Sequence, residues 1–549
     1  MVIRMEFFTG DTLKNIPRLR EIAAYRKRFC FEQLKEYISK PNTRKVMSIY
    51  GLRRTGKTVL MLQLLNEIGD SEKTCFIRCE KGDSIQDLKN VLNDNLKCDY
   101  FFLDEVTKLE DFIECSSILA DKYSELYAKK IIMAGTDSLG FYLAKKDELY
   151  DRTYMIHTTY IPYKEYNYLL GKGLEDYIMY GGTLTDGSEF YNKDNCDEYT
   201  NTAIARNIQH SLDNLGRDGE YGALASFREK GEMTTFINKI VELYTRRFTM
   251  EIVNKKFKTH DFLNLKKYAI RHDIVGDVAP LDTRKNEALR QEIMIELEIR
   301  EPLLNQATER AMLEAKKYLE MLDVVLLVPN TDEVIFTQPG LKYCQAAAQV
   351  EVLKSTSLLP YSVTEREELS EMLLNDIKGR ILEDIIFYQL SKDADFNKDY
   401  VLDKFKTAAA DGEFDIVCIH RRSNEAVVME VKHSAKHAEQ QTRHLNNMQC
   451  CKEFEAWANT KITGKMVVYM GETLDEKCFN VNYVGAEDLL KSPLKYVEQA
   501  KENDMSISIT PGELAEEIAK FPSSLVITNN IKKLGQRIVA LQSQNKMTR

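Results

Sequence analysis

Short apolar runs separated by helix-forming stretches dominate the start of the chain. The runs occupy residues 45–50, 74–79, 100–106 and 130–137. Runs of this length without polar alternation are typical of strands buried on both faces of a sheet. Helical pattern follows residue 58 and returns at 84–95 and 110–127. The alternation of strand and helix predicts an α/β fold with a parallel, doubly wound sheet.

A leading helix is expected ahead of the first run. Apolar residues recur at helical spacing over 18–39, and Pro41-Asn42 ends the pattern. We expect Arg26, Lys27 and Arg28 to form the solvated face of this helix, with contact to a ligand as the alternative.

The middle of the chain has the outline of a winged helix. Residues 187–300 are polar and helical in pattern and carry no motif of known chemistry. A helix at 303–322 then precedes two apolar runs, 324–328 and 334–337, and a further helix begins at Gly340. Helix, hairpin and helix is the order found in winged helices. In a winged helix that binds DNA, we expect the first helix to enter a DNA groove. The alternative is that the winged helix is a spacer that does not contact DNA. The residues concerned are Thr308, Arg310, Lys316 and Lys317.

The last part of the chain predicts a second α/β region. A long amphipathic helix at 369–390 precedes strands at 412–419 and 426–432. Two further strands are predicted at 465–470 and 481–484. The polar residues 496–549 contain helical stretches at 513–520 and 531–541, which we interpret as a solvated tail or a helical partner surface.

The first chemical motif directly follows the first apolar run. It has the form Gly-x-x-x-x-Gly-Lys-Thr and consists of Gly51, Leu52, Arg53, Arg54, Thr55, Gly56, Lys57 and Thr58. Its glycines allow successive backbone N–H groups to surround a polyphosphate, and the helix that follows favours anions at its N-terminus. Lys57 supplies positive charge to the β and γ phosphates, and the hydroxyl of Thr58 is placed to ligate Mg²⁺. The motif predicts an ATP-binding phosphate loop.

Two carboxylates end the third apolar run, Tyr100-Phe101-Phe102-Leu103-Asp104-Glu105. Acids at the carboxyl end of a buried strand face the ligand crevice of an open α/β sheet. We expect Asp104 to hold the magnesium shell and Glu105 to polarise the attacking water. Together with the phosphate loop, they predict an ATPase.

The amino-acid composition excludes only a few classes of protein. A chain of 549 residues with 44% hydrophobic residues suits about three globular domains. The net charge of -9 and the pI near 5.7 exclude a protein coated in positive charge but leave local basic grooves open. The 11 cysteines include no Cys-x-x-Cys pair, and no apolar run approaches the length of a membrane span. We therefore expect a cytoplasmic protein with reduced thiols and no membrane partner.

The order of these motifs resembles archaeal and bacterial AAA-type ATPases of the AAA+ superfamily whose C-terminal half is a domain of unknown function. The resemblance rests on the phosphate loop, the Asp-Glu strand, a strand ending in Gly135-Thr136, Arg152, and the stretches 161–166 and 180–182. It implies that Thr136 senses the γ-phosphate and that Arg152 is a sensor or finger arginine. An ordinary surface arginine is the alternative for Arg152, because Asp151 replaces the glycine expected before it.

A second set of candidate catalytic residues lies on the C-terminal strands. Glu430 and Lys432 are two residues apart on one strand and so share a face, and Asp415 on the neighbouring strand can join them. Carboxylates that share a face repel unless a divalent cation lies between them, as in metal-assisted phosphodiester hydrolysis. The arrangement resembles the restriction-endonuclease-like fold, which implies metal ligation by Asp415 and Glu430 and places Glu383 in the acidic position of the leading helix.

The sequence thus predicts five regions. They are a helical lead at 1–41, an AAA-type ATPase domain at 42–205, a helical and winged-helix region at 206–360, a restriction-endonuclease-like domain at 361–495 and a helical appendage at 496–549. The expected function is Mg²⁺-dependent ATP hydrolysis that controls a nuclease-like domain acting on DNA, in a possible homo-oligomer. The alternative is a nucleotide-regulated signalling or binding protein in which the nuclease-like domain is an inactive scaffold.

Overall fold

The chain divides into two compact units, each described by itself. Unit 1 comprises Met1–Leu327 and Phe336–Ser370, and unit 2 comprises Val328–Ile335 and Glu371–Arg549. The five-region division stays a prediction. The computed structural model describes residues 5–41, 44–109, 111–138, 140–141, 144, 148–185, 198–209, 222–258, 306–328, 333–355, 363–407, 412–433, 444–474 and 480–501.

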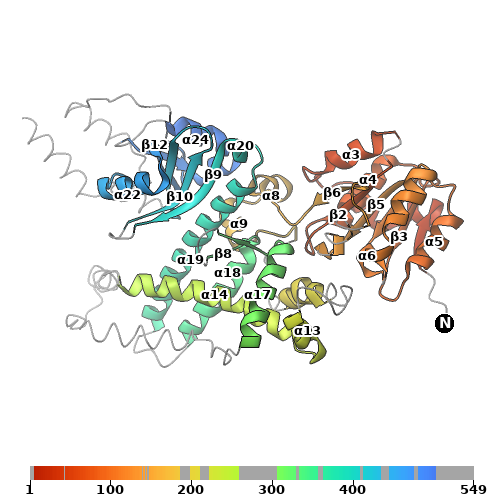
Figure 1. Cartoon of the computed structure of the whole chain (residues 1–549), viewed down its shortest axis with the longest axis horizontal. Coiled ribbons are helices and arrows are strands. Elements are labelled where there is room, and N and C mark those ends of the chain that lie inside the picture. Colours follow the sequence, from red (N-terminus) through yellow and green to blue (C-terminus); the bar gives the residue numbers. More distant parts are fainter. Residues whose placement is uncertain are drawn as a thin grey trace, which may run out of the picture. The chain divides into compact units, whose positions relative to one another are not determined.

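A six-stranded sheet forms the N-terminal part of unit 1 (Figure 1). All neighbouring strands are parallel except β1, which pairs antiparallel with β3. The predicted α/β fold is confirmed, but the sheet is mixed, and the edge strands β1 and β6 were not predicted. In spatial order the strands are β1 (Glu6–Thr9), β3 (Thr74–Arg78), β4 (Tyr100–Asp104), β5 (Lys130–Gly135), β2 (Val46–Tyr50) and β6 (Thr153–His157).

Both faces of this sheet are buried, which explains the unbroken apolar runs. Phe101 and Leu103 of β4 join one core cluster, whereas Phe102, between them, joins the other. In β5, Ile131 and Ile132 divide between the two clusters in the same way. Because successive side chains of a strand point to opposite faces, helices on both sides require apolar residues at every position.

The helices of this part of unit 1 agree with the predicted ones at α4 and α5 and differ from them at the N-terminus and at 110–127. The expected leading helix is broken: α2 ends at Ile22, α3 begins at Phe31, and residues 23–30 between them are not helical. The stretch predicted as one helix at 110–127 forms α6 and the π-helix η2. The helices are α1 (Gly10–Lys14), α2 (Pro17–Ile22), α3 (Phe31–Ser39), α4 (Lys57–Ile68), α5 (Ile85–Asp94), η1 (Val106–Lys108), α6 (Phe112–Cys115), η2 (Leu119–Leu126), α8 (Tyr163–Leu170) and α9 (Leu174–Tyr180).

The remaining described residues of unit 1 are mostly helical, and β7 pairs with β8, most of which is assigned to unit 2. The predicted order of helix, two strands and helix is present, the predicted turn at 330–333 lies largely outside the described residues, and the assignment as a winged helix stays a prediction. On its first helix, Arg310 pairs with Glu314 of the same helix at 3.4 Å. Residues 259–305 lie outside the described part of the chain. The elements are η3 (Thr200–Ala205), α13 (Gly222–Glu229), α14 (Met233–Lys258), α17 (Gln306–Met321), β7 (Val325–Leu327), β8 (Val334–Phe336) and α18 (Pro339–Ser355).

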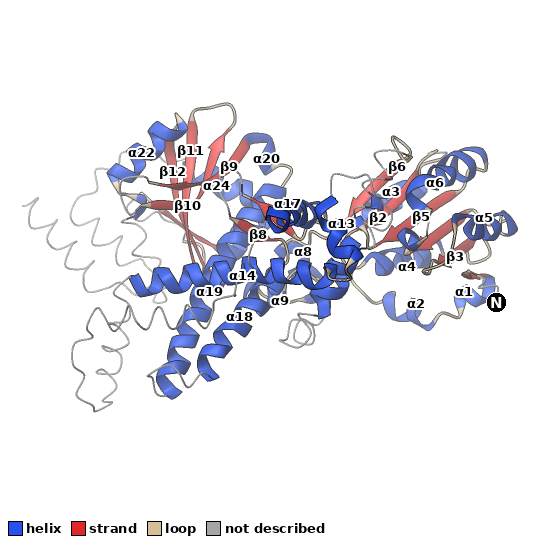
Figure 2. Cartoon of the chain, turned by 60° about the horizontal axis from the view of Figure 1, so that its bottom comes forward, coloured by secondary structure: helices blue, strands red, loops and turns tan. Residues whose placement is uncertain are grey.

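Unit 2 contains a five-stranded sheet in the order β13-β12-β11-β10-β9 (Figure 2). The strands β9, β10 and β11 are antiparallel, and β12 and β13 extend the sheet in parallel. The predicted strands are present, β9 was not predicted, and the restriction-endonuclease-like assignment is not confirmed. The predicted helices at 513–520 and 531–541 lie outside the described residues. The elements are α19 (Val363–Lys392), which begins in unit 1, α20 (Phe396–Asp399), β9 (Tyr400–Lys406), β10 (Glu413–His420), β11 (Glu425–Lys432), α22 (Met448–Ala458), β12 (Lys461–Tyr469), β13 (Asn482–Gly485), α23 (Ala486–Lys491) and α24 (Pro493–Lys501).

Two structural findings concern what the composition predicts about membrane spans and cysteines. Of the helices in the described ranges, none combines the length and apolarity needed to cross a membrane. Cys75, Cys79 and Cys418 are free, buried thiols, and burial raises the pKa of each.

Candidate active site of unit 1 and acidic cluster of unit 2

The phosphate loop connects β2 to α4 and needs glycine at both ends. Gly51 has φ +144°, and a β-carbon there would lie 2.6 Å from Oγ1 of Thr158. Gly56, with φ +88°, caps the N-terminus of α4 in the left-handed region. The loop thereby leads into the N-terminus of α4, an end of a helix that favours anions.

Lys57 and Thr58 begin α4 and point into this site. The ammonium of Lys57 is buried and donates to the carbonyl oxygens of Gly51 and Leu52, both at 2.8 Å. Burial lowers the pKa of Lys57 to about 8, against the opposing effect of Glu105 and Asp104. The hydroxyl of Thr58 donates to Asp104 at 3.1 Å. Phosphate oxygens bound at the loop would compete with these carbonyls for the ammonium of Lys57.

The order of the strands brings the predicted acidic and sensor residues to the same edge of the sheet. The phosphate loop follows β2, Thr136 follows β5, and Asp104 ends β4, with β5 lying between β2 and β4. The hydroxyl of Thr136 donates to Oε2 of Glu105 at 3.3 Å. Because the carboxyl ends of parallel strands meet at one edge, residues distant in sequence converge here.

Glu105 and Asp104 differ in their environments. Glu105 has φ +56° and ψ +37°, a left-handed conformation that is rare for residues other than glycine and is often found at functional sites. Asp104 is buried, and its pKa is raised first by burial and then by the neighbouring Glu105. Asp104 with Thr58 forms an oxygen pair that fits Mg²⁺, which takes one or two carboxylates together with phosphate oxygens.

Arg28 is buried, which corrects the expectation that it lies on a solvated helix face. It is 6% exposed, and its guanidinium donates to the backbone oxygens of Thr55, Thr158 and Tyr160 at 2.8 to 2.9 Å. The same group forms an ion pair with the buried carboxylate of Glu165 at 2.8 Å. The non-helical segment between α2 and α3 thus places an arginine that ties the phosphate loop to the chain after β6. Lys27 does lie near the surface, paired with Glu67.

The structure does not bring Arg152 to the phosphate loop of its own chain. Arg152 precedes β6, and its carbonyl oxygen accepts from Val46 at the amino end of β2, whereas the loop follows the carboxyl end of β2. Its side chain donates to Asp121 at 2.7 Å and to the backbone of Glu148 at 3.0 Å. The sensor role and the finger role of Arg152 both stay predictions.

In unit 2 the predicted Asp, Glu and Lys converge on neighbouring strands. The ammonium of Lys432 lies 3.5 Å from Asp415 and 3.4 Å from Glu430. Asp415 also accepts from the backbone N–H of Val431 at 2.8 Å. Glu383 on α19 is held by Arg380 at 2.7 Å. Asp415, Glu430 and Glu383 are each less than 10% exposed, so this set is a buried acidic cluster with two cations.

The electrostatics of this acidic cluster favour an additional positive charge. Burial, followed by Asp415, raises the pKa of Glu383 to about 7 and raises the pKa of Glu430 well above its usual value. Burial alone would lower the pKa of Lys432, but the surrounding carboxylates outweigh it and raise the pKa. Oε1 of Glu430 is buried without a hydrogen-bond partner. Among the described residues, no three His, Cys, Asp or Glu side chains form a ready-made metal cage. A cation here would therefore rely on Asp415 and Glu430 together with water or substrate oxygens.

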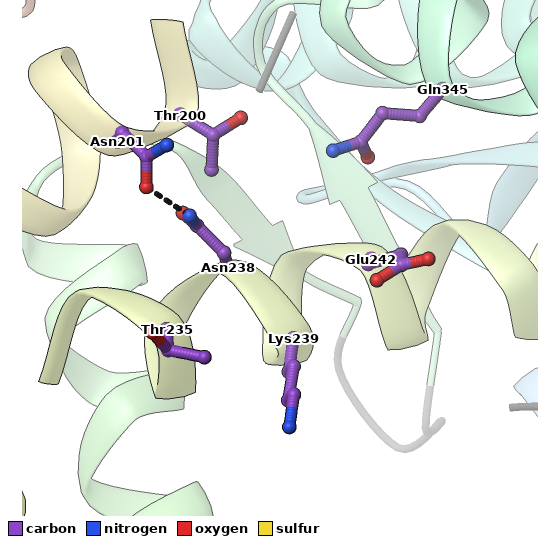
Figure 3. Close-up of a pocket in the computed structure, with 7 residues that line it drawn as sticks. All are labelled: Thr200, Asn201, Thr235, Asn238, Lys239, Glu242 and Gln345. Atoms are coloured by element: carbon purple, nitrogen blue, oxygen red, sulfur yellow. Dashed lines mark hydrogen bonds between the residues drawn. The ribbon is translucent and has the colours of Figure 1, made fainter. Parts of the chain in front are cut away.

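A polar cavity of about 290 Å³ lies beside η3 in unit 1 (Figure 3). It is bounded by η3, α14 and α18, and across it Asn238 donates to Asn201. No residue of this cavity was singled out from the sequence, because amides and hydroxyls on polar helices look like a solvated face. The lining residues are Thr200, Asn201, Thr235, Asn238, Lys239, Glu242 and Gln345.

Sequence reasoning missed three groups that hold the phosphate loop. Thr159 accepts from the backbone N–H of Leu52 at 3.0 Å, and the hydroxyls of Thr158 and Thr55 lie 2.7 Å apart. Arg28 is the third. The signal for the threonines was present, since they follow the apolar residues of β6 as polar groups follow the other strands. The burial of Arg28 had no local signal, because its partners come from distant segments.

Comparison with protein families identifies one region of the chain. Residues 43–167 match the family described as AAA domain. This range contains β2 to β6 of the sheet together with the phosphate loop, Asp104, Glu105 and Thr136. No curated protein matches the chain.

Solved structures with detectable likeness include the following three. Hsp104 of S. cerevisiae in its complex with casein is 15% identical, with 47% of this chain and 51% of that chain covered and a TM-score of 0.23. DnaA from Aquifex aeolicus bound to AMPPCP is 15% identical, with 53% and 86% covered and a TM-score of 0.21. PCH-2 of C. elegans is 12% identical, with 57% and 70% covered and a TM-score of 0.19. This chain spans about half the length of the Hsp104 chain.

The family match and the site geometry concern the same residues. The matched range holds the phosphate loop, the Thr58–Asp104 oxygen pair that fits Mg²⁺, and the Glu105 carboxylate that accepts from Thr136. Residues 43–167 are therefore the part of the chain that is similar to the AAA domain family, and this part contains the phosphate loop.

Proposed function

We propose that this protein hydrolyses ATP with Mg²⁺ at the carboxyl edge of the unit 1 sheet. The observation that carries the proposal is the convergence of Lys57, the Thr58–Asp104 pair and the Glu105–Thr136 pair at that edge. Phosphoryl transfer depends mainly on positioning and charge stabilisation, which these residues supply. Lys57 binds the phosphates, Thr58 and Asp104 hold Mg²⁺, Glu105 accepts a proton from water, and Thr136 orients Glu105.

The first test is nucleotide binding by Lys57→Ala. The substitution removes charge-assisted hydrogen bonds to phosphate, so affinity for Mg-ATP should fall about 10- to 100-fold. Titration of a fluorescent ATP analogue measures the dissociation constant, and Lys73→Ala, which removes a lysine that is 58% exposed, is the matched control. Equal affinity in Lys57→Ala and wild type would remove this loop from the binding site.

A pH profile tests the buried state of Lys57 directly. Its pKa in the free protein is lowered to about 8, and bound phosphate favours the ammonium form, so binding takes up a proton above that pH. Affinity for a non-hydrolysable ATP analogue should therefore be constant below pH 8 and fall up to about tenfold per pH unit above it. Lys57→Arg keeps its charge over this range and should give a flat profile. A flat profile in the wild type would contradict the proposed environment of Lys57.

We further propose that the acidic cluster of unit 2 is a metal-dependent phosphodiesterase site controlled by the ATPase. The observation that favours it is the unpartnered, buried Oε1 of Glu430 beside Asp415 and Lys432. A divalent cation would give that oxygen a partner and would polarise a water or phosphate oxygen. Lys432 would then orient or deprotonate water. DNA is the proposed substrate, and Glu383 supports the site from α19.

The competing proposal is a nucleotide-regulated binding or signalling protein. In that case the ion pairs of Lys432 with Asp415 and Glu430 are structural, and the unit 2 sheet is a scaffold. The two proposals differ in whether DNA is cleaved when Mg²⁺ or Mn²⁺ is present. A homo-oligomer is also proposed, in which Arg152 would reach the ATP site of a neighbouring copy.

A further inference from the structure

A chain of hydrogen bonds links Glu105 to the helical segment that contains Asn207. The side-chain amide of Asn207 donates to the backbone oxygen of Thr136 at 3.1 Å and to that of Ala203 at 2.7 Å. Thr136 in turn donates its hydroxyl to Glu105 at 3.3 Å. Asn207 and Thr136 are 6% and 8% exposed, so water does not compete freely for the two hydrogen bonds of the Asn207 amide.

Asn207 lies in the helical segment 198–209, which includes η3 and follows the family-matched range. The segment is anchored at its start, where the hydroxyl of Tyr199 donates to Gln338 at 3.0 Å. On another side it borders the polar cavity, across which Asn201 accepts from Asn238 (Figure 3). Within its described surroundings, the segment is therefore held by specific polar contacts next to open space. A shift of this segment would move the Asn207 amide and, with it, the carbonyl of Thr136.

We propose that Asn207 is a positioning residue for ATP hydrolysis. By holding the backbone of Thr136, it fixes the hydroxyl that orients Glu105, and it makes turnover depend on the position of the 198–209 segment. The inference rests on the proposed ATPase function of Glu105 and adds to it a residue beyond the matched domain. Asn207 itself needs no contact with nucleotide, so its removal should affect turnover and leave binding intact.

The test compares Asn207→Asp and Asn207→Ala with wild type. Aspartate keeps the volume of asparagine but loses the amide donor, and alanine removes the side chain without adding charge. We expect kcat to fall about 10- to 100-fold, the usual effect of a small displacement of a catalytic group, with the Kd for Mg-ATP within about twofold of wild type. Thr202→Ala is the matched control, because its hydroxyl bonds only to Glu198 within the same segment in the described structure. Thr202→Ala should turn over ATP as wild type does.

A double-mutant cycle with Glu105→Gln separates positioning from general damage. If Asn207 acts through Glu105, Asn207→Ala should cause little further loss once Glu105 is glutamine, as measured by single-turnover hydrolysis. Wild-type kcat in folded Asn207→Ala would overturn the inference, as would fully additive losses or a parallel loss of nucleotide binding. If Glu105→Gln alone left turnover unchanged, the proposed catalytic role of Glu105 would fail instead. Thermal melting of each variant shows that the comparison is made between folded proteins.

Discussion

Glu105→Gln should bind Mg-ATP as tightly as wild type and hydrolyse it about 100- to 10,000-fold more slowly, the range for loss of a positioned general base. The amide has nearly the same shape as the carboxylate and can still accept the hydrogen bond from Thr136. It cannot accept a proton from the attacking water. Phosphate release under saturating ATP measures kcat, and binding of a fluorescent analogue measures affinity.

Substitution of an exposed carboxylate is the control for the loss of one negative charge. Glu36→Gln neutralises a carboxylate whose side chain is 62% exposed on α3, and it should leave turnover unchanged. Wild-type turnover in Glu105→Gln would show that another group activates water. Loss of binding in a folded Glu105→Gln protein would place Glu105 in nucleotide binding rather than in the hydrolytic step.

Lys432→Ala should abolish metal-dependent DNA cleavage while ATP hydrolysis continues at the wild-type rate. Lys432 lies within 3.5 Å of both Asp415 and Glu430, so its removal deletes the cation that would orient water beside the metal. ATP hydrolysis should be unaffected, because Lys432 belongs to unit 2 and the ATPase residues belong to unit 1. The matched control is Lys461→Ala, an exposed lysine at the start of β12 in the same sheet.

Cleavage should be measured on single- and double-stranded DNA with Mg²⁺ or Mn²⁺, each with and without ATP. Dependence of cleavage on ATP, lost in Lys57→Ala, would join the two units in one mechanism. If every form of DNA survived all of these conditions in the wild type, the nuclease proposal would be wrong. The scaffold proposal would then account for the ion pairs of Lys432.

The local signals were sufficient for the central strands and for the phosphate loop. Apolar runs predicted β2, β3, β4 and β5 because both sheet faces are covered, and the glycine spacing predicted the loop. The edge strands β1 and β6 were missed, since their residues are partly exposed and their pattern is weak. The prediction of one leading helix was wrong over residues 23–30. Apolar residues keep their helical spacing through this stretch, but the stretch is not helical, and its Arg28 contacts distant segments instead.

Residue identity in this protein determined the chemistry that can take place, and the tertiary structure decided which groups take part in it. Glycine and lysine at fixed spacing specify a phosphate site, because backbone dihedrals and charge are local properties. Arg28 contacts the phosphate loop and Asn207 contacts Thr136 only because distant segments pack around them, and Arg152 lies near the amino end of β2 because β6 runs parallel to β2. Burial and long-range hydrogen bonds depend on how segments pack, and that packing depends on the chain as a whole.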